Sequence, residues 1–450
     1  MRKQVLILLA SLVGMAATAR DYNIVDFGAK SDTTVLSTQA IQQAIDRCSS
    51  AGGGRVVVPA GMFKTGTLVL KSHVDLHLET GATLYGSTRL ENYTPLKPAY
   101  VSLRTQGETV QLIYADRVHD VSITGYGTID GRGSAFKKLS WNDEGITRPH
   151  LLRFIECENV TVSDVTLRNS GCWMQHYLAC DCLRITGIKI FNRNNYNNDA
   201  LDLDGCHDVV VSDIMADSDD DGITLKSTSP RLCENIVIQN CIVSSHCNAI
   251  KLGTETNGGF RNINIANCVV HPSEDQSSQF FGDPSKRGTS VISLEITDGG
   301  TMENVHVSNI VAEGTESPIF IRLGNRARSY AKNEPVTKVG TIRGVHLSNI
   351  TVHGAGKTGC SITGLPGHPV EDVWLSDITI QQQGGCGETA VPDDEKEKDY
   401  PEATMWGVLP AKGFFVRHAR HITFRHVEIQ NSQPDARPDF VEVDVEDVEG

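Results

Sequence analysis

Acidic residues stand directly before two short apolar runs in the middle of the chain. Asp199 precedes Ala200-Leu201-Asp202-Leu203-Asp204, and the pair Asp220-Asp221 precedes Gly222-Ile223-Thr224-Leu225. Neighbouring carboxylates cannot all ionise cheaply, so one of them is expected to keep its proton to higher pH. A protonated acid beside an ionised base is the arrangement that acid–base catalysis needs. The competing interpretations of Asp219-Asp220-Asp221 are a solvated acidic turn and a calcium site.

Aligning the apolar pairs of successive runs predicts which polar residues lie together. We superpose Leu201/Leu203, Ile223/Leu225 and Ile250/Leu252, because like positions of stacked parallel strands lie about 4.8 Å apart. The predicted columns are Asp199–Asp221–Asn248, Asn198–Asp220–Cys247 and Asp202–Thr224–Lys251, with Asp204 beside Lys226. Extending the register to Ile321/Leu323 places Arg322 in the column of Lys251. The carboxylates then have cations near them on one outer face.

One difficulty concerns the direction of the aspartates. Strict alternation along a strand gives Asp199 and Asp221 the same inward parity as the leucines. We therefore expect the chain to bend before each strand, so that these side chains turn outward.

The elements that hold these residues repeat along the chain. An Asn or Asp, an alternating apolar strand, a polar turn and a second apolar run recur from Asn159 to Phe424. Each unit is too small to bury its apolar face alone. Stacking the units as a solenoid buries these faces against one another. We predict an all-β fold, a right-handed parallel β-helix with an N-terminal capping helix over 38–48 and Ser37 as its N-cap. Asn240 and Asn267 are assigned to structural side-chain ladders.

The chain is divided into two parts. Residues 1–19 combine Arg2-Lys3, an apolar run and Ala17-Thr18-Ala19, the pattern of a cleaved secretory signal. Residues 20–450 are expected to form a single catalytic β-helix domain. The polar stretches 271–288, 326–340 and 383–412 lack the repeat and are expected to be loops beside a cleft, with a purely solvated role as the alternative.

Charge and cysteine content limit the partners. The chain carries 55 acidic and 41 basic residues, a net charge of −14, which disfavours nucleic acid and anionic membranes. An acidic substrate therefore requires a local concentration of basic groups. We expect an exported monomer, periplasmic or extracellular, with no membrane insertion of the mature chain and no metal or cofactor. The 12 cysteines lack zinc spacing, and buried free thiols are favoured over disulfides, whose pairing stays open.

Several motifs carry a family resemblance that covers nearly the whole mature chain. They are Val25-Asp26-Phe27-Gly28-Ala29-Lys30, Gly52-Gly53-Gly54, Gly81-Ala82-Thr83-Leu84-Tyr85-Gly86-Ser87, Asn169-Ser170 with Trp173 and His176, Asn197-Asn198-Asp199 and Asp220-Asp221. In these the chain resembles the polygalacturonase family of inverting glycoside hydrolases, in its bacterial exported form. The resemblance implies that Asp220 is the general acid and that Asp199 and Asp221 hold and activate the water. His176 is expected to be a hydrogen-bonded structural residue.

Two departures from the family concern substrate binding. The family's Gly-His-Gly segment falls on Cys247-Asn248-Ala249, and its Arg-Ile-Lys segment falls on Arg322-Leu323-Gly324. Arg322 can still bind a carboxylate with two hydrogen bonds. The remaining candidates for substrate binding are Lys251, Lys226, Asn248, Asp202 and Glu255.

The resemblance implies hydrolysis of galacturonic-acid linkages in an acidic plant cell-wall polysaccharide, pectin. The departures favour a rhamnogalacturonan or an exo-acting enzyme over a plain endo-hydrolase. Two alternatives remain. One is a calcium-dependent pectate-type lyase, which leaves an unsaturated product. The other is a non-catalytic carbohydrate-binding β-helix.

Overall fold

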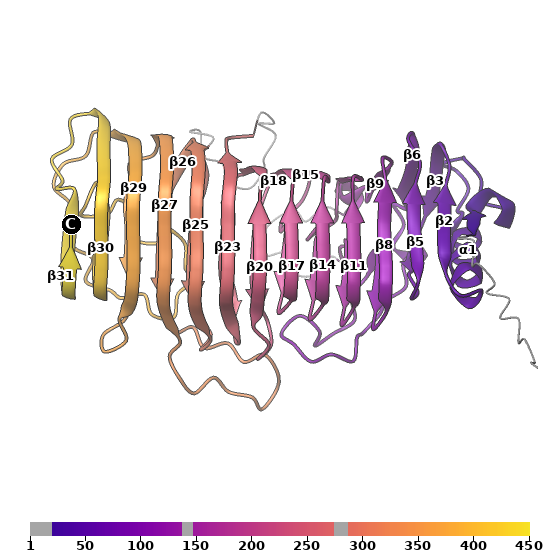
Figure 1. The fold of residues 1–450 in the computed structure, drawn as a ribbon, viewed down its shortest axis with the longest axis horizontal. Helices are drawn as coiled ribbons and strands as arrows, with labels where there is room; N and C mark the ends of the chain where they lie inside the picture. Colours follow the sequence, from indigo (N-terminus) through magenta and orange to yellow (C-terminus); the bar gives the residue numbers. More distant parts are fainter. Residues whose placement is uncertain (1–19, 137–146, 274–286) are drawn as a thin grey trace, which may run out of the picture.

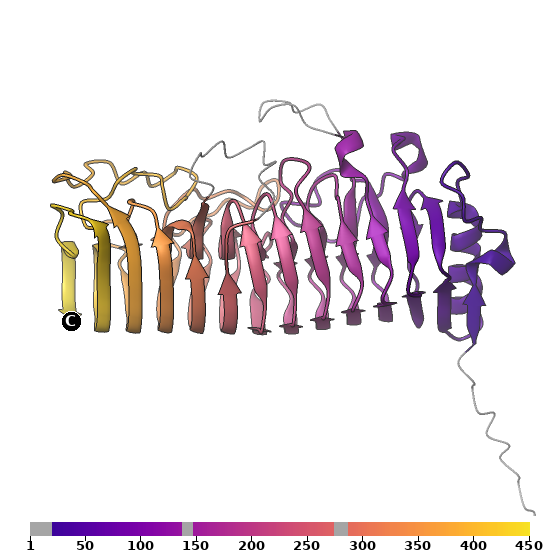
Figure 2. The same ribbon diagram turned by 90° about the horizontal axis from the view of Figure 1, so that it is seen from above.

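The chain winds into a stack of parallel strands in which each strand pairs with the strand one turn later (Figures 1 and 2). The computed structural model describes residues 20–136, 147–273 and 287–450. The predicted fold class, an all-β right-handed parallel β-helix with an N-terminal capping helix, is confirmed. The proposed signal segment 1–19 and residues 274–286 of the expected loop 271–288 lie outside the described residues.

Three sheets run along the stack. The first contains β1 (Asp21–Asn23), β2 (Gly54–Val58), β5 (Val74–Leu78), β8 (His119–Gly125), β11 (Glu158–Ser163), β14 (Asp181–Thr186), β17 (His207–Ser212) and β20 (Cys233–Gln239). The second contains β3 (Gly61–Thr65), β6 (Ala82–Gly86), β9 (Thr128–Asp130), β12 (Thr166–Arg168), β15 (Lys189–Asn192), β18 (Met215–Ser218) and β21 (Ile242–Ser245).

The third sheet carries the predicted site. It contains β4 (Leu68–Val69), β7 (Gln111–Asp116), β10 (His150–Ile155), β13 (Gln175–Leu178), β16 (Leu201–Asp204), β19 (Ile223–Ser227), β22 (Asn248–Thr256), β24 (Gly288–Ile296), β26 (Thr315–Leu323) and β28 (Cys360–Thr363). In the later turns, long strands continue the first two sheets without a break. These are β23 (Gly259–Val270), β25 (Thr301–Glu313), β27 (Thr341–Ala355) and β29 (Val370–Gly384). The last two strands, β30 (Phe414–Gln433) and β31 (Phe440–Glu449), also extend the third sheet, because β28 pairs with the start of β30 and β30 with β31. Short 3₁₀ turns are η1 (Ile24–Phe27), η2 (Leu90–Asn92) and η3 (Gly133–Phe136).

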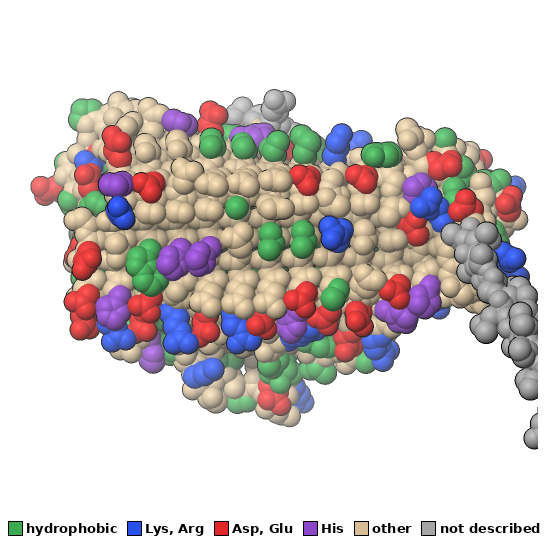
Figure 3. Space-filling view, in the orientation of Figure 1, with side chains coloured by type: hydrophobic (Ala, Val, Ile, Leu, Met, Phe, Trp, Pro, Cys, Tyr) green, Lys and Arg blue, Asp and Glu red, His purple; other side chains and the backbone are tan. Residues whose placement is uncertain are grey.

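Alternation along each strand builds the core. In β8, Val121 and Ile123 are buried while Ser122 and Thr124 between them are partly exposed. Stacking the turns joins such inward residues into one apolar cluster along the stack, which removes from water the surface that a single turn would leave exposed. Like positions also stack outside: Figure 3 shows side chains of one kind in rows across the strands, and His306, His346 and Trp374 stack with ring centroids 4.4 and 4.3 Å apart.

Helix α1 (Thr38–Ser50) closes the N-terminal end of the stack (Figure 1). Ile41, Ala44, Ile45 and Cys48 are buried in the core cluster. Ser37 holds the N-cap position, but its side chain does not cap the helix. The hydroxyl oxygen of Ser37 instead accepts a hydrogen bond from the backbone N–H of Lys30 at 3.0 Å, so it fixes the preceding loop.

Asparagine ladders mark equivalent turns, as predicted for Asn240 and Asn267. Both residues have left-handed backbone, with φ of 57° and 58°, which Asn tolerates better than most residues. The amide of Asn267 donates to Asn240 Oδ1 at 3.4 Å, and Asn309 donates to Asn267 at 3.0 Å. These side chains satisfy one another along the stack.

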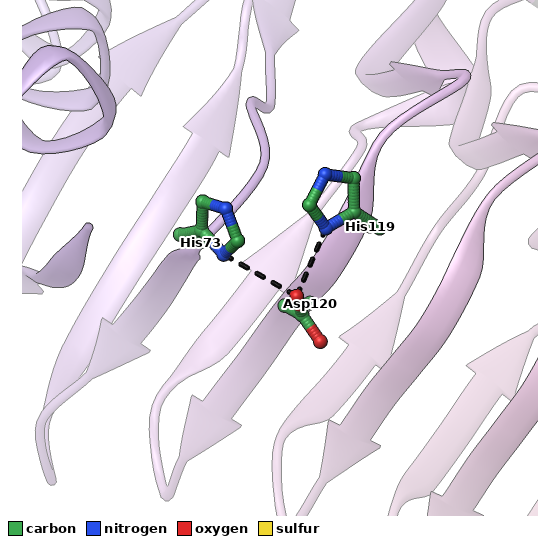
Figure 4. Close-up of side chains that lie close together, drawn as sticks. All are labelled: His73, His119 and Asp120. Atoms are coloured by element: carbon green, nitrogen blue, oxygen red, sulfur yellow. Dashed lines mark hydrogen bonds and ion pairs between the residues drawn. The ribbon is translucent and has the colours of Figure 1, made fainter. Parts of the chain in front are cut away.

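A second ladder begins near the N-terminus with histidines (Figure 4). Asp120 Oδ2 lies 3.3 Å from Nδ1 of His73 and 2.9 Å from Nδ1 of His119, while Asp120 Oδ1 accepts from the amide of Asn159 at 2.5 Å. These hydrogen bonds and the histidine charges lower the pKa of Asp120. The cluster is exposed and belongs to the first sheet, away from the predicted site.

Most cysteines are free thiols in the interior, which the sequence analysis favoured over disulfides. All 12 cysteines are free, and all but Cys182 and Cys386 are buried. They act here as small apolar side chains. In the described part of the chain, no helix combines the length and the apolar surface needed to cross a bilayer.

Long connections cover the outer face of the third sheet. The residues of β16 and β19 are buried on both sides, although only one side faces the core. The β6–β7 connection and the β26–β27 connection meet there, where the amide of Gln106 donates to the carbonyl oxygen of Tyr330 at 3.1 Å. Both can be followed below the strands in Figure 1. This covering turns an exposed sheet face into an enclosed one.

Candidate functional site

Asp199, Asp220 and Asp221 line one cavity of about 330 Å³ on the outer face of the third sheet. The register that predicted this is confirmed: Leu201 pairs with Ile223, and Ile223 with Ile250. The columns Asp202–Thr224–Lys251 and Asp204–Lys226 follow from the same pairing. Three carboxylates from two adjacent turns therefore meet at the edge where strands β16 and β19 begin.

The expected bend before each strand is present. The chain bends at Ala200 and at Gly222, between the aspartates and the strands. Polar side chains fix both approaches: Asn198 Oδ1 accepts from the N–H of Asn194 at 2.9 Å, and the hydroxyl of Ser218 donates to the carbonyl oxygens of Asp220 and Asp221 at 3.0 and 3.1 Å. The aspartate side chains thus leave the alternation that would have pointed them inward.

Asp221 is built to stay ionised. Its Oδ2 lies 3.1 Å from Lys251 Nζ, and its Oδ1 accepts from the side-chain amide of Asn248 at 2.9 Å. Burial alone would raise the pKa of Asp221, but Lys251, Lys226 and the Asn248 hydrogen bond together lower it. Asn248, at the position of the family's histidine, therefore stabilises a carboxylate.

The other two aspartates hold protons more tightly. Burial and the charge of Asp221 raise the pKa of Asp220 to about 6. Burial, with the charges of Asp202 and Asp220, raises the pKa of Asp199 well above its usual value. Asp221 is therefore the readily ionised carboxylate of the three, and Asp220 keeps its proton below a pH of about 6.

Lys226 joins the aspartates to a second layer of charges. Its Nζ lies 3.4 Å from Asp202 Oδ1, 3.7 Å from Asp199 Oδ2 and 3.7 Å from Glu255 Oε2. It also lies 4.6 Å from the centre of the Trp173 ring. Burial raises the pKa of Asp202 to about 7 against the opposing effect of Lys226. Although Asp204 is beside Lys226 in register, its Oδ2 contacts His176 Nε2 at 3.1 Å and the hydroxyl of Thr228 at 2.6 Å.

His176 forms a buried hydrogen bond, as expected from the sequence. It is 1 % exposed, and burial lowers its pKa to about 4, so the ring is neutral near pH 6. Its hydrogen bond to Asp204 fixes the outer face of β13 next to the aspartates.

Glu255 lines the cavity and binds cations of the protein itself. Its Oε1 accepts from Arg328 Nη2 at 2.9 Å and also from Arg104. Burial would raise the pKa of Glu255, but Arg104, Lys226 and Arg328 hold it well below its usual range. The negative charge of Glu255 offsets the cations at this end of the cavity.

The far wall comes from the β29–β30 connection, which contributes Tyr400 and Glu402 to the cavity. Tyr400 accepts a hydrogen bond from Lys251 Nζ at 3.3 Å. Burial raises the pKa of Glu402 to about 8, so this carboxyl is neutral at acidic pH. The predicted loops 326–340 and 383–412 therefore do stand beside a cleft, through Arg328, Tyr400 and Glu402.

A second cavity, of about 340 Å³, adjoins the first and shares Arg104, Trp173 and Asn197 with it. Its remaining lining includes Arg148, His150, Arg153 and His176. Arg153 and His176 pair in register with Asp202, so both cavities stand on the same outer face of the third sheet. Arg104, Arg148 and Arg153 thus concentrate basic groups in the second cavity, as an acidic substrate would require.

The position predicted for Arg322 is wrong. Lys251 pairs with Ser293 and Ser293 with Phe320, so Arg322 stands in the column of Glu295. The sequence alignment passed over β24 and matched Ile321 and Leu323 to Ile250 and Leu252, two residues beyond the true partners Ile319 and Ile321. Arg322 is 1 % exposed, donates to carbonyl oxygens of Gly364 and Glu395 at 3.2 and 2.6 Å, and does not line either cavity. Its proposed contact with substrate therefore has no support in the geometry.

Metal binding can be compared with the donors present. Oxygens of Asp220 and Asp221 and the sulfur of Cys247 lie within 4.8 Å of one another. Both oxygens of Asp221 are already bound by Lys251 and Asn248, and burial raises the pKa of the Cys247 thiol well above its usual value. Because metals bind thiolates and unprotonated oxygens, these groups fit acid–base chemistry better than metal binding.

Comparison with known proteins agrees with this site. The model of Glycosyl hydrolases family 28 matches residues 48–396. The chain belongs to this family. It is 32% identical over 223 residues to a probable polygalacturonase of Vitis vinifera, covering 47% of this chain and 45% of that protein. It is 37% identical over 155 residues to an exo-poly-alpha-D-galacturonosidase of Dickeya chrysanthemi, covering 33% of this chain and 25% of that protein.

The matched segments thus span less than half the length of these curated relatives. Solved structures extend the similarity over most of the fold. An exopolygalacturonase from Thermotoga maritima has a TM-score of 0.67 at 25% identity, covering 81% of this chain and 87% of its own. A family 28 exopolygalacturonase from Yersinia enterocolitica has a TM-score of 0.72 at 21% identity, covering 96% and 78%, and shows the shared fold.

Sequence reasoning missed the arginines of the two cavities and the residues of the β29–β30 connection. Arg104 lies in a connection without any repeat, and Tyr400 and Glu402 lie in another, so no register placed them. Arg153 did carry a signal. It interrupts the apolar run Leu151-Leu152-Arg153-Phe154, and an arginine inside a strand that is otherwise buried requires a partner.

Gly222 provides a test of how the bend sets the site. A Cβ at this position would lie 2.4 Å from the carbonyl oxygen of Ala249 and 2.5 Å from Val243 Cγ1. The substitution Gly222→Ala must therefore displace the start of β19, which moves Asp221 away from Lys251. We expect a lower melting temperature and a large loss of any activity of the site. Gly107→Ala, where a Cβ meets nothing within 4 Å, is the matched control in thermal melts; equal melting temperatures would contradict the explanation.

Proposed function

We propose that this protein is an exported glycoside hydrolase that cleaves galacturonic-acid glycosidic bonds of pectin with inversion of configuration. The observation that carries the proposal is the meeting of Asp199, Asp220 and Asp221 in one cavity, where Asp221 ionises readily and Asp220 keeps its proton below a pH of about 6. Membership in family 28 and the printed activities of the Vitis and Dickeya relatives support the same reaction.

Each aspartate has a distinct part in the proposed reaction. Asp220 donates its proton to the glycosidic oxygen, and the bond from that oxygen to the anomeric carbon breaks. A water molecule held by Asp199 and Asp221 attacks the anomeric carbon from the opposite face and transfers its proton to Asp221. Lys251 and Asn248 keep Asp221 ionised for this step, and Lys226 positions Asp199. The products are two sugars, one with a new hydroxyl of inverted configuration.

Removal of single terminal residues is the mode we propose. Arg104, Arg328, Tyr400 and Glu402, which come from three long connections, line the reaction cavity together with Trp173. Arg104 and Arg328 meet at Oε1 of Glu255. Such walls restrict how much polysaccharide can pass through the site. The names of the Dickeya and Thermotoga relatives agree with exo action.

Product analysis tests the proposal. Polygalacturonate and rhamnogalacturonan fragments are incubated with the protein, and the products are separated by chromatography and followed by proton NMR. Early release of monogalacturonate with inverted anomeric configuration is expected. A ladder of intermediate lengths would contradict exo action, and a retained configuration would contradict the mechanism. A rise in ultraviolet absorbance that a chelator abolishes would establish the lyase alternative instead.

The pH dependence of kcat/KM follows from the two aspartates. Asp220 must be protonated to donate, and its pKa is about 6, so activity should fall as the pH rises through about 6. Asp221 must be ionised, and its pKa is lowered, so activity should persist below pH 4 before falling. Initial rates between pH 3 and 8 check this prediction. An optimum near pH 8 would contradict the assignment of Asp220 as the acid.

A further inference from the structure

We propose that the cavity of about 340 Å³ next to the aspartates is a second sugar-acid subsite, in which Arg148 and Arg153 bind the carboxylate of a neighbouring uronate residue. The proposal rests on the proposed hydrolysis of galacturonate linkages, and it assigns a substrate-binding role to residues that no family motif marked. It depends on the charges and unpaired donors of this cavity.

The first observation is uncompensated positive charge. Arg153 is 1 % exposed, and its guanidinium donates to Thr109 Oγ1 and, at 2.8 Å, to the carbonyl oxygen of Arg104. Arg148 donates to the carbonyl oxygen of Tyr196 and, at 2.9 Å, to Asn197 Oδ1. These are neutral acceptors, and within the described ranges neither arginine forms an ion pair with a carboxylate. Arg153 is a buried charge without an ionic partner, which is destabilising unless an anion binds it, and the partly exposed Arg148 adds a second positive charge to the same cavity.

The second observation is a group of buried polar nitrogen atoms with no partner, in which the arginine Nε–H groups are donors and Nδ1 of His176 is an acceptor, because Nε2 of this neutral ring binds Asp204. Among the described residues, Nε of Arg104, Nε of Arg153, Nδ1 of His150 and Nδ1 of His176 are buried atoms without a hydrogen-bond partner. All four residues line this cavity. Such atoms are rare in folded proteins, because each costs free energy when it loses water and gains no bond. A ligand rich in oxygen atoms, such as a sugar acid, would satisfy them together.

The histidines add hydrogen bonding without adding charge. Burial, then the charge of Arg153, lowers the pKa of His150 well below its usual value, and burial lowers the pKa of His176 to about 4. Both imidazoles are therefore neutral near pH 6 and can bind sugar hydroxyls. The positive charge of the cavity thus comes from its arginines, whose planar guanidinium groups bind carboxylates through two parallel hydrogen bonds.

The position of the cavity fits an adjoining sugar. It shares Arg104, Trp173 and Asn197 with the reaction cavity. Arg153 stands two turns from Asp202 in the same column, which is about 10 Å along the stack. Arg104 differs from the other two arginines, because it pairs with Glu255 and so has its charge offset. The recognition of a uronate carboxylate is therefore assigned to Arg148 and Arg153.

The test compares a free acid with its ester. Trigalacturonate and its fully methyl-esterified form are given to the protein and to the variant Arg153→Met. We expect the ratio of kcat/KM for acid to that for ester to fall about 10- to 100-fold in the variant. A merely structural defect would lower both values together and leave the ratio unchanged, which would overturn the proposal. Arg261→Met, which removes a surface ion pair with Glu234, is the matched control and should leave the ratio unaltered.

Binding separates this inference from the proposed function. Calorimetry with the variant Asp220→Asn measures the affinity for trigalacturonate without turnover. Combining Arg153→Met with Asp220→Asn should weaken that binding about 10- to 100-fold, and thermal melts confirm that both proteins are folded. Absence of hydrolysis with binding that depends on Arg153 would reject the reaction and keep the subsite. Equal binding by both proteins would reject the subsite.

Discussion

Replacing Asp220 with asparagine is expected to lower kcat by about 10²- to 10⁴-fold, the usual contribution of a general acid. Asparagine has nearly the same shape but no proton to give to the glycosidic oxygen. Its Oδ1 can still accept the hydrogen bond from the N–H of Asp221, which is 2.9 Å long, and the carbonyl oxygen of residue 220 keeps its hydrogen bonds from Ser218 and Ser245. The substitution should therefore remove the chemistry and preserve the turn.

The measurement is the initial rate on oligogalacturonates at pH 5, with the thermal midpoint as the control for folding. Asp213→Asn is a suitable matched variant. Asp213 has left-handed backbone with φ of 58° in the turn ladder, where Asn240 and Asn267 occupy the equivalent places, so asparagine fits there. That variant should keep full activity. An Asp220→Asn enzyme with a rate within a few-fold of the unaltered protein would reject Asp220 as the acid.

The fold could be predicted because its signals are local and repeated. Alternation of apolar residues, left-handed Asn and Asp at turns and one amphipathic helix each point to the same stacked architecture. The register of Leu201, Ile223 and Ile250 was predicted from leucine and isoleucine pairs alone. The strand pairing in the structure confirms it. Register between stacked strands is well specified whenever one face is buried, because a shift by one residue would expose the core.

The limits of prediction lie where the repeat stops. Arg322 was misplaced by two residues, because Ile321 and Leu323 were matched to Ile250 and Leu252, whereas Ile319 and Ile321 hold those places. Arg104, Tyr400 and Glu402 reach the cavity from long connections, whose paths depend on contacts such as that between Gln106 and Tyr330. Such contacts join residues far apart in sequence and leave no periodic signal.

Replacing Lys226 is the second change for which we expect a large effect, in this case a lower free energy of unfolding. Lys226 is 4 % exposed and lies within ion-pair distance of Asp199, Asp202 and Glu255. Replacing it with methionine keeps the apolar stem but leaves these buried carboxylates without their shared cation. Removing one partner of a buried ion pair typically costs about 3–5 kcal/mol in free energy of unfolding, and we expect a loss of this size for Lys226→Met. Lys71→Met, at an exposed position, should change little.

The loss should depend on pH in a defined direction. The pKa of Asp202 is about 7 with Lys226 present, and without that cation it rises further. A carboxyl whose pKa is raised on folding stabilises the fold fully below its unfolded value, about 4, and that contribution is lost as the pH rises through the folded value. The Lys226→Met protein should therefore be closest to the unaltered protein near pH 4 and fall furthest behind above pH 7. Denaturant unfolding at pH 4, 6 and 8 measures this, and adding Asp202→Asn to the variant should recover stability at pH 8. A penalty that does not change with pH would show that Lys226 stabilises the protein through packing against Trp173 rather than through its charge.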